Sequence, residues 1–208
     1  MASQVYRRYT ELPYLLHILQ HRELALPSPS AWDDKNDAHF MEAYRKRLSL
    51  PNIFALCFAE CTETYHHWKV FCPGSSGVCI KFHKTTLEAW ANRTPNLRGQ
   101  SVVYKTLEGL QQKAPGTSDL PFIKRYAFRD EKEYRLIFED KVYTDKIAVV
   151  PLPIDLIEGV TINPWLPREV FRSVRDQIRS LDGCDKLKIR HSTVVQNQDW
   201  KAAMEIGA

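Results

Sequence analysis

The stretch Ile53-Phe54-Ala55-Leu56-Cys57-Phe58 is apolar at every position, and Pro51 separates it from the charged segment before it. A strand with one solvent-facing side alternates apolar and polar residues, whereas a strand buried on both faces does not. The stretch therefore predicts a strand near the centre of a sheet. Further strands are predicted at 5–9, 78–82, 101–104, 134–138, 146–150, 158–162 and 186–195, with 134–138 and 146–150 expected to pair as antiparallel neighbours.

Helices are predicted between these strands, where apolar residues recur at a spacing of three or four. The leucines from Leu12 to Leu19 form the first such pattern, with Thr10 as the expected N-cap. Thr85-x-x-Glu88 has the spacing of a capping box at the start of another helix. Further helices are expected near 40–48, 62–71 and 168–181. The strands come in blocks without a regular strand–helix–strand rhythm, so the sequence favours one α+β domain over residues 1–208.

Composition excludes several classes of protein. The chain has 208 residues, 44% of them hydrophobic, which is enough for one core without disulfides or metals. The 29 Lys+Arg and 25 Asp+Glu residues give a net charge of +4, too small to mark a dedicated nucleic-acid-binding protein. No apolar run approaches the ~20 residues of a membrane span, and residues 1–8 lack the apolar core of a signal peptide. We therefore expect a cytoplasmic protein without a membrane partner.

Two carboxylates and a guanidinium share one face where a strand begins. In Glu131-Lys132-Glu133-Tyr134-Arg135, the period of two places Glu131, Glu133 and Arg135 on the same side of the chain. Such a group can act as an acid/base site or anchor a hydroxylated ligand. It can equally be a solvated strand end with an exposed ion pair, and spacing alone favours this second interpretation.

Cysteines and histidines cluster in residues 57–79 without forming a clear metal-binding motif. Zinc sites are usually built from closely spaced ligand pairs. Cys57-x3-Cys61 barely meets that spacing and Cys72-x6-Cys79 does not. The odd total of five cysteines is typical of a reducing compartment rather than a disulfide framework. We expect no metal, with zinc at Cys57–Cys79 as the open alternative, and a catalytic cysteine paired with His66 or His67 is weaker still.

An arginine stripe follows the predicted helix at 168–181. Arg168, Arg172, Arg175 and Arg179 recur at helical spacing, while apolar residues occupy much of the other side. The stripe could contact the phosphates of a nucleic acid or an acidic partner protein. A solvated outer face is the more common explanation of such a pattern. Common signatures of phosphoryl transfer, metalloproteases and serine hydrolases are absent from the sequence.

Several short motifs follow one another in a recognisable order. They are Tyr6-Arg7, Trp32-Asp33-Asp34-Lys35-Asn36-Asp37, Leu56-Cys57-Phe58-Ala59-Glu60, Trp68, Gly77-Val78-Cys79-Ile80-Lys81-Phe82 and Glu131-Lys132-Glu133-Tyr134-Arg135. This order resembles the bacterial family named domain of unknown function 2971. The resemblance covers residues 5–160 and leaves 161–208 as a C-terminal helix and strand. The sequence departs from the family pattern at Asp33, Lys35, Ala59 and Phe71.

The layout is also similar to that of ADP-ribosyltransferases, which implies split mixed or antiparallel sheets with flanking helices and NAD as the substrate. By that resemblance Glu133 is the catalytic acid, Glu131 orients the acceptor and Arg7 holds phosphate or ribose. A carboxylate suits this chemistry, because breaking the nicotinamide–ribose bond develops positive charge. Aromatic side chains could stack on the cofactor rings. The expected cofactor-binding set is Tyr6, Arg7, Tyr9, Trp32, Asp34, Trp68 and Arg135.

Three functions stay open. The first is NAD-dependent transfer of ADP-ribose to a macromolecule, either protein or nucleic acid, or simple cleavage of NAD. The resemblance implies the setting of a bacterial toxin or phage-defence effector, with a possible partner protein. The second is a non-catalytic module of the same fold that binds a nucleotide, a nucleic acid or a protein, which Ala59 and Phe71 favour. The third is a Mg²⁺-dependent nuclease-like effector using Asp33, Asp34, Asp37, Glu131 and Glu133.

Overall fold

One large sheet organises the part of the chain that the structure describes, residues 4–142 and 146–205 of a computed structural model. Its strands are β1 (Val5–Glu11), β3 (Asn52–Ala59), β4 (Gly77–His83), β5 (Leu97–Ser101), β8 (Glu133–Asp140), β10 (Ile157–Ile162) and β11 (Ile189–His191). They lie in the order β11-β10-β4-β1-β3-β8-β5. Neighbouring strands are antiparallel except for the parallel pair β10 and β11. The sheet is therefore mixed.

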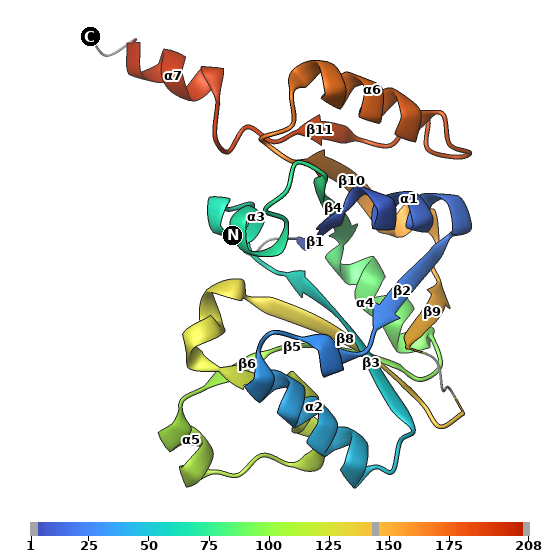
Figure 1. The fold of residues 1–208 in the computed structure, drawn as a ribbon, viewed down its shortest axis with the longest axis vertical. Coiled ribbons are helices and arrows are strands. Elements are labelled where there is room, and N and C mark those ends of the chain that lie inside the picture. Colours follow the sequence, from blue (N-terminus) through green and yellow to red (C-terminus); the bar gives the residue numbers. More distant parts are fainter. Residues whose placement is uncertain (1–3, 143–145, 206–208) are drawn as a thin grey trace.

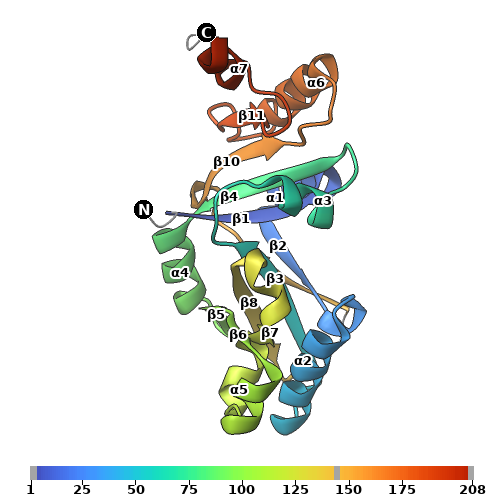
Figure 2. The same cartoon turned by 90° about the vertical axis from the view of Figure 1, so that its left-hand side faces the viewer.

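The sheet parts into two halves between β1 and β3. β1 pairs with β4 along its whole length, and β3 pairs equally completely with β8. β1 and β3, in contrast, share one paired position, at which Arg7 lies opposite Ala59. Figure 2 shows β1, β4 and β10 running across the upper part of the molecule while β3, β8 and β5 descend below them. The two halves diverge from this single contact.

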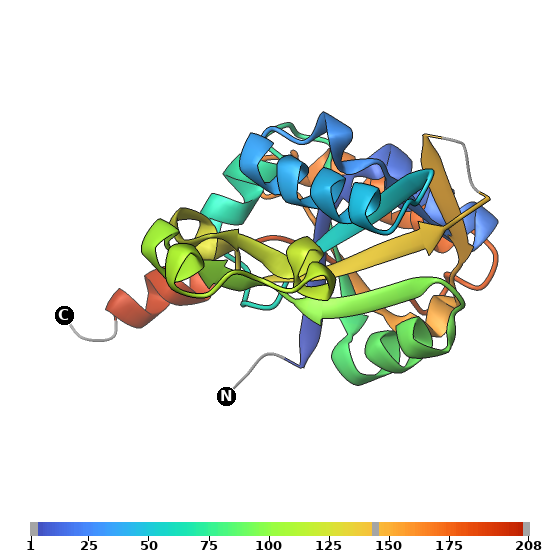
Figure 3. The ribbon, with the colours of Figure 1, turned by 90° about the horizontal axis from the view of Figure 1, so that it is seen from below.

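Helices cover the lower half of the sheet on both sides, because β3 is apolar on both faces. Phe54, Leu56 and Phe58 point into the main core. That core also receives α1 (Leu12–His21), α4 (Lys84–Arg93) and α6 (Arg168–Arg179). Ile53 and Ala55 point to the other side and pack against α2 (Lys35–Arg47). Figure 3 shows α2 and α4 on opposite sides of the strands of this half. The predicted central strand is thus confirmed.

Smaller elements complete the described chain. β2 (Glu23–Pro27) pairs antiparallel with β9 (Ile147–Pro151), and β6 (Val103–Lys105) pairs parallel with β7 (Ile123–Arg125). The short 3-10 helices are η1 (Pro29–Ala31), η2 (Thr117–Phe122), η3 (Tyr126–Glu131) and η4 (Ile154–Leu156). The remaining helices are α3 (Tyr65–Phe71), α5 (Leu107–Gln112) and α7 (Gln198–Glu205) (Figure 1). None of the described helices is long and apolar enough to cross a membrane.

The predicted α+β class is confirmed, but one predicted strand pairing is wrong. Segments 134–138 and 146–150 do not pair: β8 lies between β3 and β5, and β9 pairs with β2. The reason is burial, because Leu136 and Ile137 point to opposite faces and both are fully buried. A strand of this kind needs a neighbour on each edge and a helix on each face, which a simple hairpin with the next strand would not provide.

Several predicted boundaries also differ from the structure. Helix α1 begins at Leu12 with Glu11 at its N-cap, and α4 begins at Lys84 without a side-chain cap, so neither Thr10 nor Thr85 is a cap. The predicted strand at 101–104 divides into the end of β5 and the start of β6. The strand predicted at 186–195 is formed only at Ile189–His191. The sequence patterns do not predict β2, β7, α5 or α7.

Candidate active site

A cavity of about 340 Å³ opens where the two halves of the sheet part. This volume falls within the roughly 300–1,000 Å³ of typical small-molecule sites. Its walls come from β1, β3, β7, β8, α3, η3 and the segment from Trp32 to the first turn of α2. The lining residues are Arg7, Arg8, Tyr9, Trp32, Asp33, Asp34, Asp37, Cys57, Phe58, Ala59, Val70, Phe71, Lys124, Phe128, Glu131 and Glu133.

The backbone around Glu133 is held from three directions. Its N–H donates to the Tyr104 hydroxyl at 2.8 Å, and its carbonyl accepts the Val102 N–H at 2.8 Å. The preceding residue, Lys132, adopts a left-handed conformation with φ 44°, and its carbonyl accepts the Glu60 N–H at 2.7 Å. This turn ends η3 and begins β8. The Glu133 side chain therefore enters the cavity from a fixed strand end.

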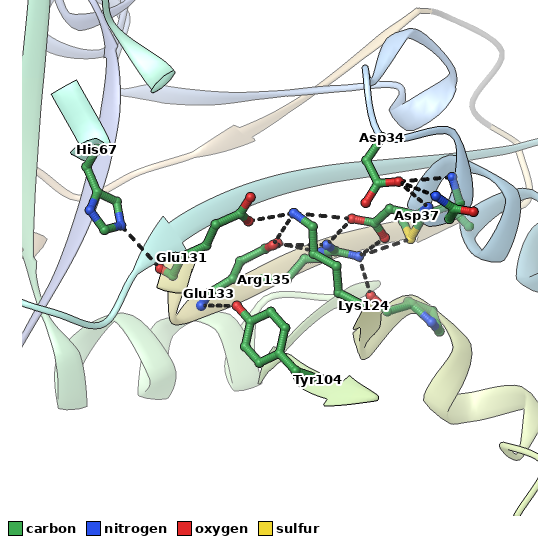
Figure 4. A network of polar contacts seen from close by, with 11 residues as sticks. Asp34, Asp37, His67, Tyr104, Lys124, Glu131, Glu133 and Arg135 are labelled. Carbon is green, nitrogen blue, oxygen red and sulfur yellow. Dashed lines mark hydrogen bonds and ion pairs between the residues drawn. The ribbon is translucent and has the colours of Figure 1, made fainter. Parts of the chain in front are cut away.

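Glu133 is buried in an ion-pair network centred on Arg135 (Figure 4). Arg135 Nε donates to Glu133 Oε1 at 2.6 Å, and Arg135 Nη2 donates to Oε2 at 3.1 Å. The same guanidinium donates to Asp37 Oδ1 at 2.8 Å and Oδ2 at 2.6 Å. Arg135 is 0% exposed and Glu133 3% exposed. The sequence pattern correctly placed Glu133 and Arg135 on one face of the chain. The two side chains form a buried ion pair, however, and do not lie at a solvated strand end.

Lys124 extends this network to the second carboxylate. Its Nζ lies 2.5 Å from Glu131 Oε2, 3.3 Å from Glu133 Oε2 and 3.7 Å from Asp37 Oδ2. Figure 4 shows the ammonium between these side chains. The His67 ring also approaches this group, with Nε2 3.4 Å from the Glu131 carbonyl oxygen. Strands β7 and β8, η3, α2 and α3 therefore meet around one group of charges.

The two carboxylates differ in their pKa values. Burial alone would raise the pKa of Glu133, but Arg135 and then Lys124 attract its charged form and lower that pKa to about 2. Burial raises the pKa of Glu131 above its ordinary value, although Lys124 opposes this effect. Glu133 is thus a permanent anion at neutral pH. Such a group can stabilise positive charge or accept a hydrogen bond from a hydroxyl, but it is a weak base.

Two neighbouring arginines from β1 line the cavity and differ in their partners. Arg7 Nη1 donates to the Cys61 carbonyl at 2.6 Å, which ties β1 to the chain after β3. Arg8 Nη1 donates to the Cys57 carbonyl at 3.2 Å, and among the described residues Arg8 forms no ion pair. Burial lowers the pKa of Arg8. A partly buried guanidinium without a carboxylate partner is costly to desolvate and provides a binding group for an anion.

Aromatic rings surround the charged groups. The Trp32 ring lies against the Arg135 guanidinium, 4.8 Å from ring centroid to Cζ, and the Phe128 ring lies 5.0 Å from Lys124 Nζ. Tyr9 stacks on His67 with ring centroids 5.4 Å apart. Phe71 of α3 is 42% exposed and Val70 is more so, although both line the cavity. These surfaces can cover a planar ring of a ligand.

Six of the predicted site residues meet at the cavity, namely Glu133, Glu131, Arg7, Tyr9, Trp32 and Asp34. Arg135 lies behind them and orients Glu133 without lining the cavity. Tyr6 lies on the opposite face of β1, stacked on Tyr134 at 4.1 Å, in the main core. Trp68 is 0% exposed, and its indole N–H donates to Glu63 at 2.7 Å. Tyr6 and Trp68 are therefore core residues and are not among the proposed ligand contacts.

Sequence reasoning missed Arg8, Lys124 and Phe128. Arg8 belongs to the core face of β1 by strand alternation, and it reaches the cavity because β1 and β3 separate beside it. Lys124 and Phe128 follow a region broken by glycines and prolines, and they belong to no recognisable motif. The carboxylates of Asp37, Glu131 and Glu133 require more than one cation, but this requirement is visible only after the fold has brought them together.

The predicted arginine stripe lies on α6, beside β11 at the edge of the sheet (Figure 1). Arg168, Arg172 and Arg179 are exposed, whereas Arg175 is partly buried and pairs with Asp176 at 2.9 Å. None of the four lines the cavity. The stripe and the cavity are therefore separate features.

The described residues contain no group of three or more His, Cys, Asp or Glu side chains arranged to hold a metal ion. The five cysteines are free thiols. Asp37, Glu131 and Glu133 do converge, but the cation between them is the Lys124 ammonium. Neither the zinc site nor the Mg²⁺-dependent nuclease is therefore part of the proposed function.

Comparisons with known proteins give structural similarity only. No family model and no curated protein matches the sequence. The structure of Thermus sp. 2.9 DarT in complex with carba-NAD+ aligns at 13% identity with a TM-score of 0.46, over 95% of this chain and 97% of that one. The structure of the same protein with ADP-ribosylated ssDNA aligns at 13% identity with a TM-score of 0.48, over 95% of each chain. The NAD+ complex aligns at 11% identity with a TM-score of 0.42, over 95% of this chain and 96% of that one. These low scores establish neither a shared site nor a shared activity, so membership of the family named domain of unknown function 2971 and the ADP-ribosyltransferase activity stay predictions.

Proposed function

We propose that this protein binds NAD in the cavity and breaks the bond between nicotinamide and ribose. The ADP-ribose is transferred to a macromolecule or, without an acceptor, to water. This reaction is the one implied by the resemblance in the sequence motifs. The observation that carries the proposal is the position of Glu133, a buried and permanently ionised carboxylate at a cavity where the sheet divides.

The charge state of Glu133 suits this chemistry. Departure of nicotinamide leaves positive charge on the ribose, as in glycoside cleavage. A fixed carboxylate stabilises that charge where it develops and needs no proton transfer to do so. Arg135 donates to both oxygens of Glu133, and a carboxylate has about four acceptor sites. Glu133 can therefore also accept a hydrogen bond from a ribose hydroxyl. Lys124 and Arg135 hold the carboxylate in one orientation, which reduces the reorganisation that the reaction requires.

Other lining groups match the remaining parts of NAD. Arg8 is the guanidinium without a carboxylate partner among the described residues, and a planar donor fork suits a pyrophosphate. Trp32, Tyr9 and Phe71 provide apolar faces for the nicotinamide or adenine ring. Glu131 lines the same cavity, and its side chain is 21% exposed against 3% for Glu133, so it can contact an acceptor group that approaches from solvent. The acceptor is a protein or a nucleic acid; a defence or toxin role and any partner protein stay predictions.

The test is the release of free nicotinamide from NAD by the purified protein and by Glu133→Gln. We expect Glu133→Gln to lower the rate by about 100-fold or more, the cost typical of losing one fixed electrostatic group in a transition state. Glu139→Gln is the matched control, because Glu139 lies on the same strand and binds Tyr44 and Arg98 away from the cavity. A Glu133→Gln protein that is folded and fully active, or wild type that is inactive with cell lysate as the acceptor source, would refute the proposal.

A non-catalytic binding module is the second candidate, and one observation favours it. Both oxygens of Glu133 already accept hydrogen bonds from cations, and the group of Asp37, Glu131, Glu133, Lys124 and Arg135 is nearly balanced in charge. Such a network can serve structure alone. This function predicts ligand binding through Arg8 or the α6 stripe with steep salt dependence and without nicotinamide release.

A further inference from the structure

Lys124 is the middle residue of β7. It is a charged residue of the site that belongs to no motif recognised in the sequence. β7 pairs in parallel with β6, so its backbone is fixed beside the cavity. The Lys124 residue is 9% exposed. Its side chain ends between two carboxylates of the cavity wall and Asp37 of α2, and the Phe128 ring covers it at 5.0 Å. Its role described so far is to help Arg135 hold the Glu133 carboxylate in one orientation.

The two cations of the network, Arg135 and Lys124, form ion pairs with different carboxylates. Arg135 binds Asp37 and Glu133, while Glu131 forms its ion pair with Lys124 at 2.5 Å. Lys124 therefore joins the two glutamates, because it also reaches Glu133 at 3.3 Å. Without it, three carboxylates would face one guanidinium. Like charges that share a buried site cannot all stay ionised, so one of them takes up a proton.

Glu131 is the carboxylate that would respond. Glu133 keeps its two hydrogen bonds from Arg135, which hold it in the charged form. Glu131 is already raised in pKa by burial, with Lys124 opposing that rise. The charged and titratable groups that face it come from four elements, and they are Lys124 on β7, Glu133 and Arg135 on β8, Asp37 on α2 and His67 on α3.

We propose that Lys124 is a positioning residue, a built-in counter-cation that holds Glu131 ionised and close to Glu133 at the wall of the cavity. It keeps both glutamates available to the reaction. The catalytic consequence rests on the proposed function, whereas the effect of Lys124 on Glu131 does not. The two can therefore be tested separately.

The first measurement is independent of activity. The side-chain carboxyl of Glu131 is titrated by NMR in ¹³C-glutamate-labelled wild type, Lys124→Met and Lys124→Arg, with Glu131→Gln to assign the resonance. We expect the pKa of Glu131 to rise in Lys124→Met and to return toward the wild-type value in Lys124→Arg. Lys84→Met is the control, because Lys84 pairs with Glu60 away from the cavity. If Lys124→Met does not fold, Lys124→Gln removes the charge and keeps a hydrogen-bonding side chain.

The second measurement is the pH profile of nicotinamide release. In Lys124→Met the acidic limb should move to higher pH, with a loss of about tenfold near neutral pH, equivalent to about 1.4 kcal/mol. Lys124→Arg should restore most of the rate. An unchanged pKa of Glu131 in a folded charge-neutral variant would overturn the role of Lys124, even if wild type cleaves NAD. Inactive wild type would overturn the proposed function instead, while the NMR titration would still decide the role of Lys124.

Discussion

Arg135 and Asp37 are 98 residues apart in sequence and share two short hydrogen bonds, 2.8 and 2.6 Å, in which one guanidinium faces one carboxylate. This pair joins β8 to the first turn of α2. Asp34 caps that helix by accepting the N–H groups of Asn36 and Asp37. The chain that carries Trp32 and Asp34 is thereby fixed at the cavity. The same guanidinium orients Glu133, so one buried residue positions both walls of the site.

Arg135→Met should strongly destabilise the protein. The substitution leaves Asp37 and Glu133 without their main counter-charge in a buried place, and breaking a buried ion pair in this way costs about 3–5 kcal/mol. The measurement is the free energy of unfolding in urea. Arg98→Met is the control, because the Arg98 side chain is 40% exposed where it pairs with Glu139, and such a partly solvated pair is worth about 1 kcal/mol or less. Similar losses in the two variants would contradict the structural role given to Arg135.

Acid should remove a part of the stability that depends on Glu133. The pKa of Glu133 is about 2 in the folded state, against an ordinary value of 4.5. A carboxyl group whose pKa is lower in the folded state stabilises the protein at pH values above its pKa in the unfolded state. This stabilisation is lost as the pH falls toward the pKa of the folded state. The total is about 3 kcal/mol, of which about 2 kcal/mol is lost by pH 3. Urea unfolding of wild type and Glu133→Gln at pH 5, 4 and 3 measures the difference. Parallel pH dependence in the two proteins would show that Glu133 is not paired as described.

The sequence predicts the fold class and the central strand because their signals are local. The run from Ile53 to Phe58 has no polar residue, and only a two-sided environment explains it. Glu133 and Arg135 share a face by strand period alone. Glu131, which the sequence also assigns to that strand face, instead ends η3 and reaches the cavity through the left-handed turn at Lys132. The pairing of β8 is not local. It depends on burial of Leu136 and Ile137 against partners far along the chain. The short distance in sequence favoured 146–150 as the pairing partner of this strand, and that prediction was wrong.

The rest of the site depends on tertiary contacts that leave little trace in sequence. Arg7 and Arg8 are adjacent arginines, and strand alternation assigns only one of them to the cavity. The divergence of β1 and β3 after one paired position brings Arg8 to the cavity as well. Tyr6 and Trp68 look like ligand-stacking residues by composition, but both are core residues. Lys124 follows an irregular segment, and only the assembled carboxylates show why a lysine lies there.

The arginines on α6 should contribute to binding of polyanions without contributing to stability. Arg168, Arg172 and Arg179 are exposed, so their replacement by glutamine removes charge and little packing. The salt dependence of binding is the slope of log K plotted against the logarithm of the salt concentration. Each lost contact with a phosphate of single-stranded nucleic acid should make this slope less steep by about 0.7, so the loss of three contacts should change it by about 2. Anisotropy of a fluorescent single-stranded oligonucleotide measures this slope. The control replaces Arg47, Arg93 and Lys113, three exposed cations on other parts of the chain. Equal slopes in both triple variants would mean that α6 is only a solvated face.

Arg8→Gln should weaken binding of the anionic part of the ligand while leaving the fold intact. Among the described residues Arg8 has no ion-pair partner, and its Nη1 donates to the Cys57 carbonyl at 3.2 Å. Loss of a partly buried cation without an ion-pair partner costs the folded state little and can even stabilise it. We expect the affinity for ADP-ribose, measured by calorimetry at low salt, to fall at least about tenfold, or about 1.4 kcal/mol. Lys81→Gln is the matched control, since Lys81 lies opposite Arg7 on β4 and outside the cavity lining. Unchanged affinity in Arg8→Gln, with the control also unchanged, would move the anion site elsewhere and leave the guanidinium of Arg8 with a structural role beside Cys57.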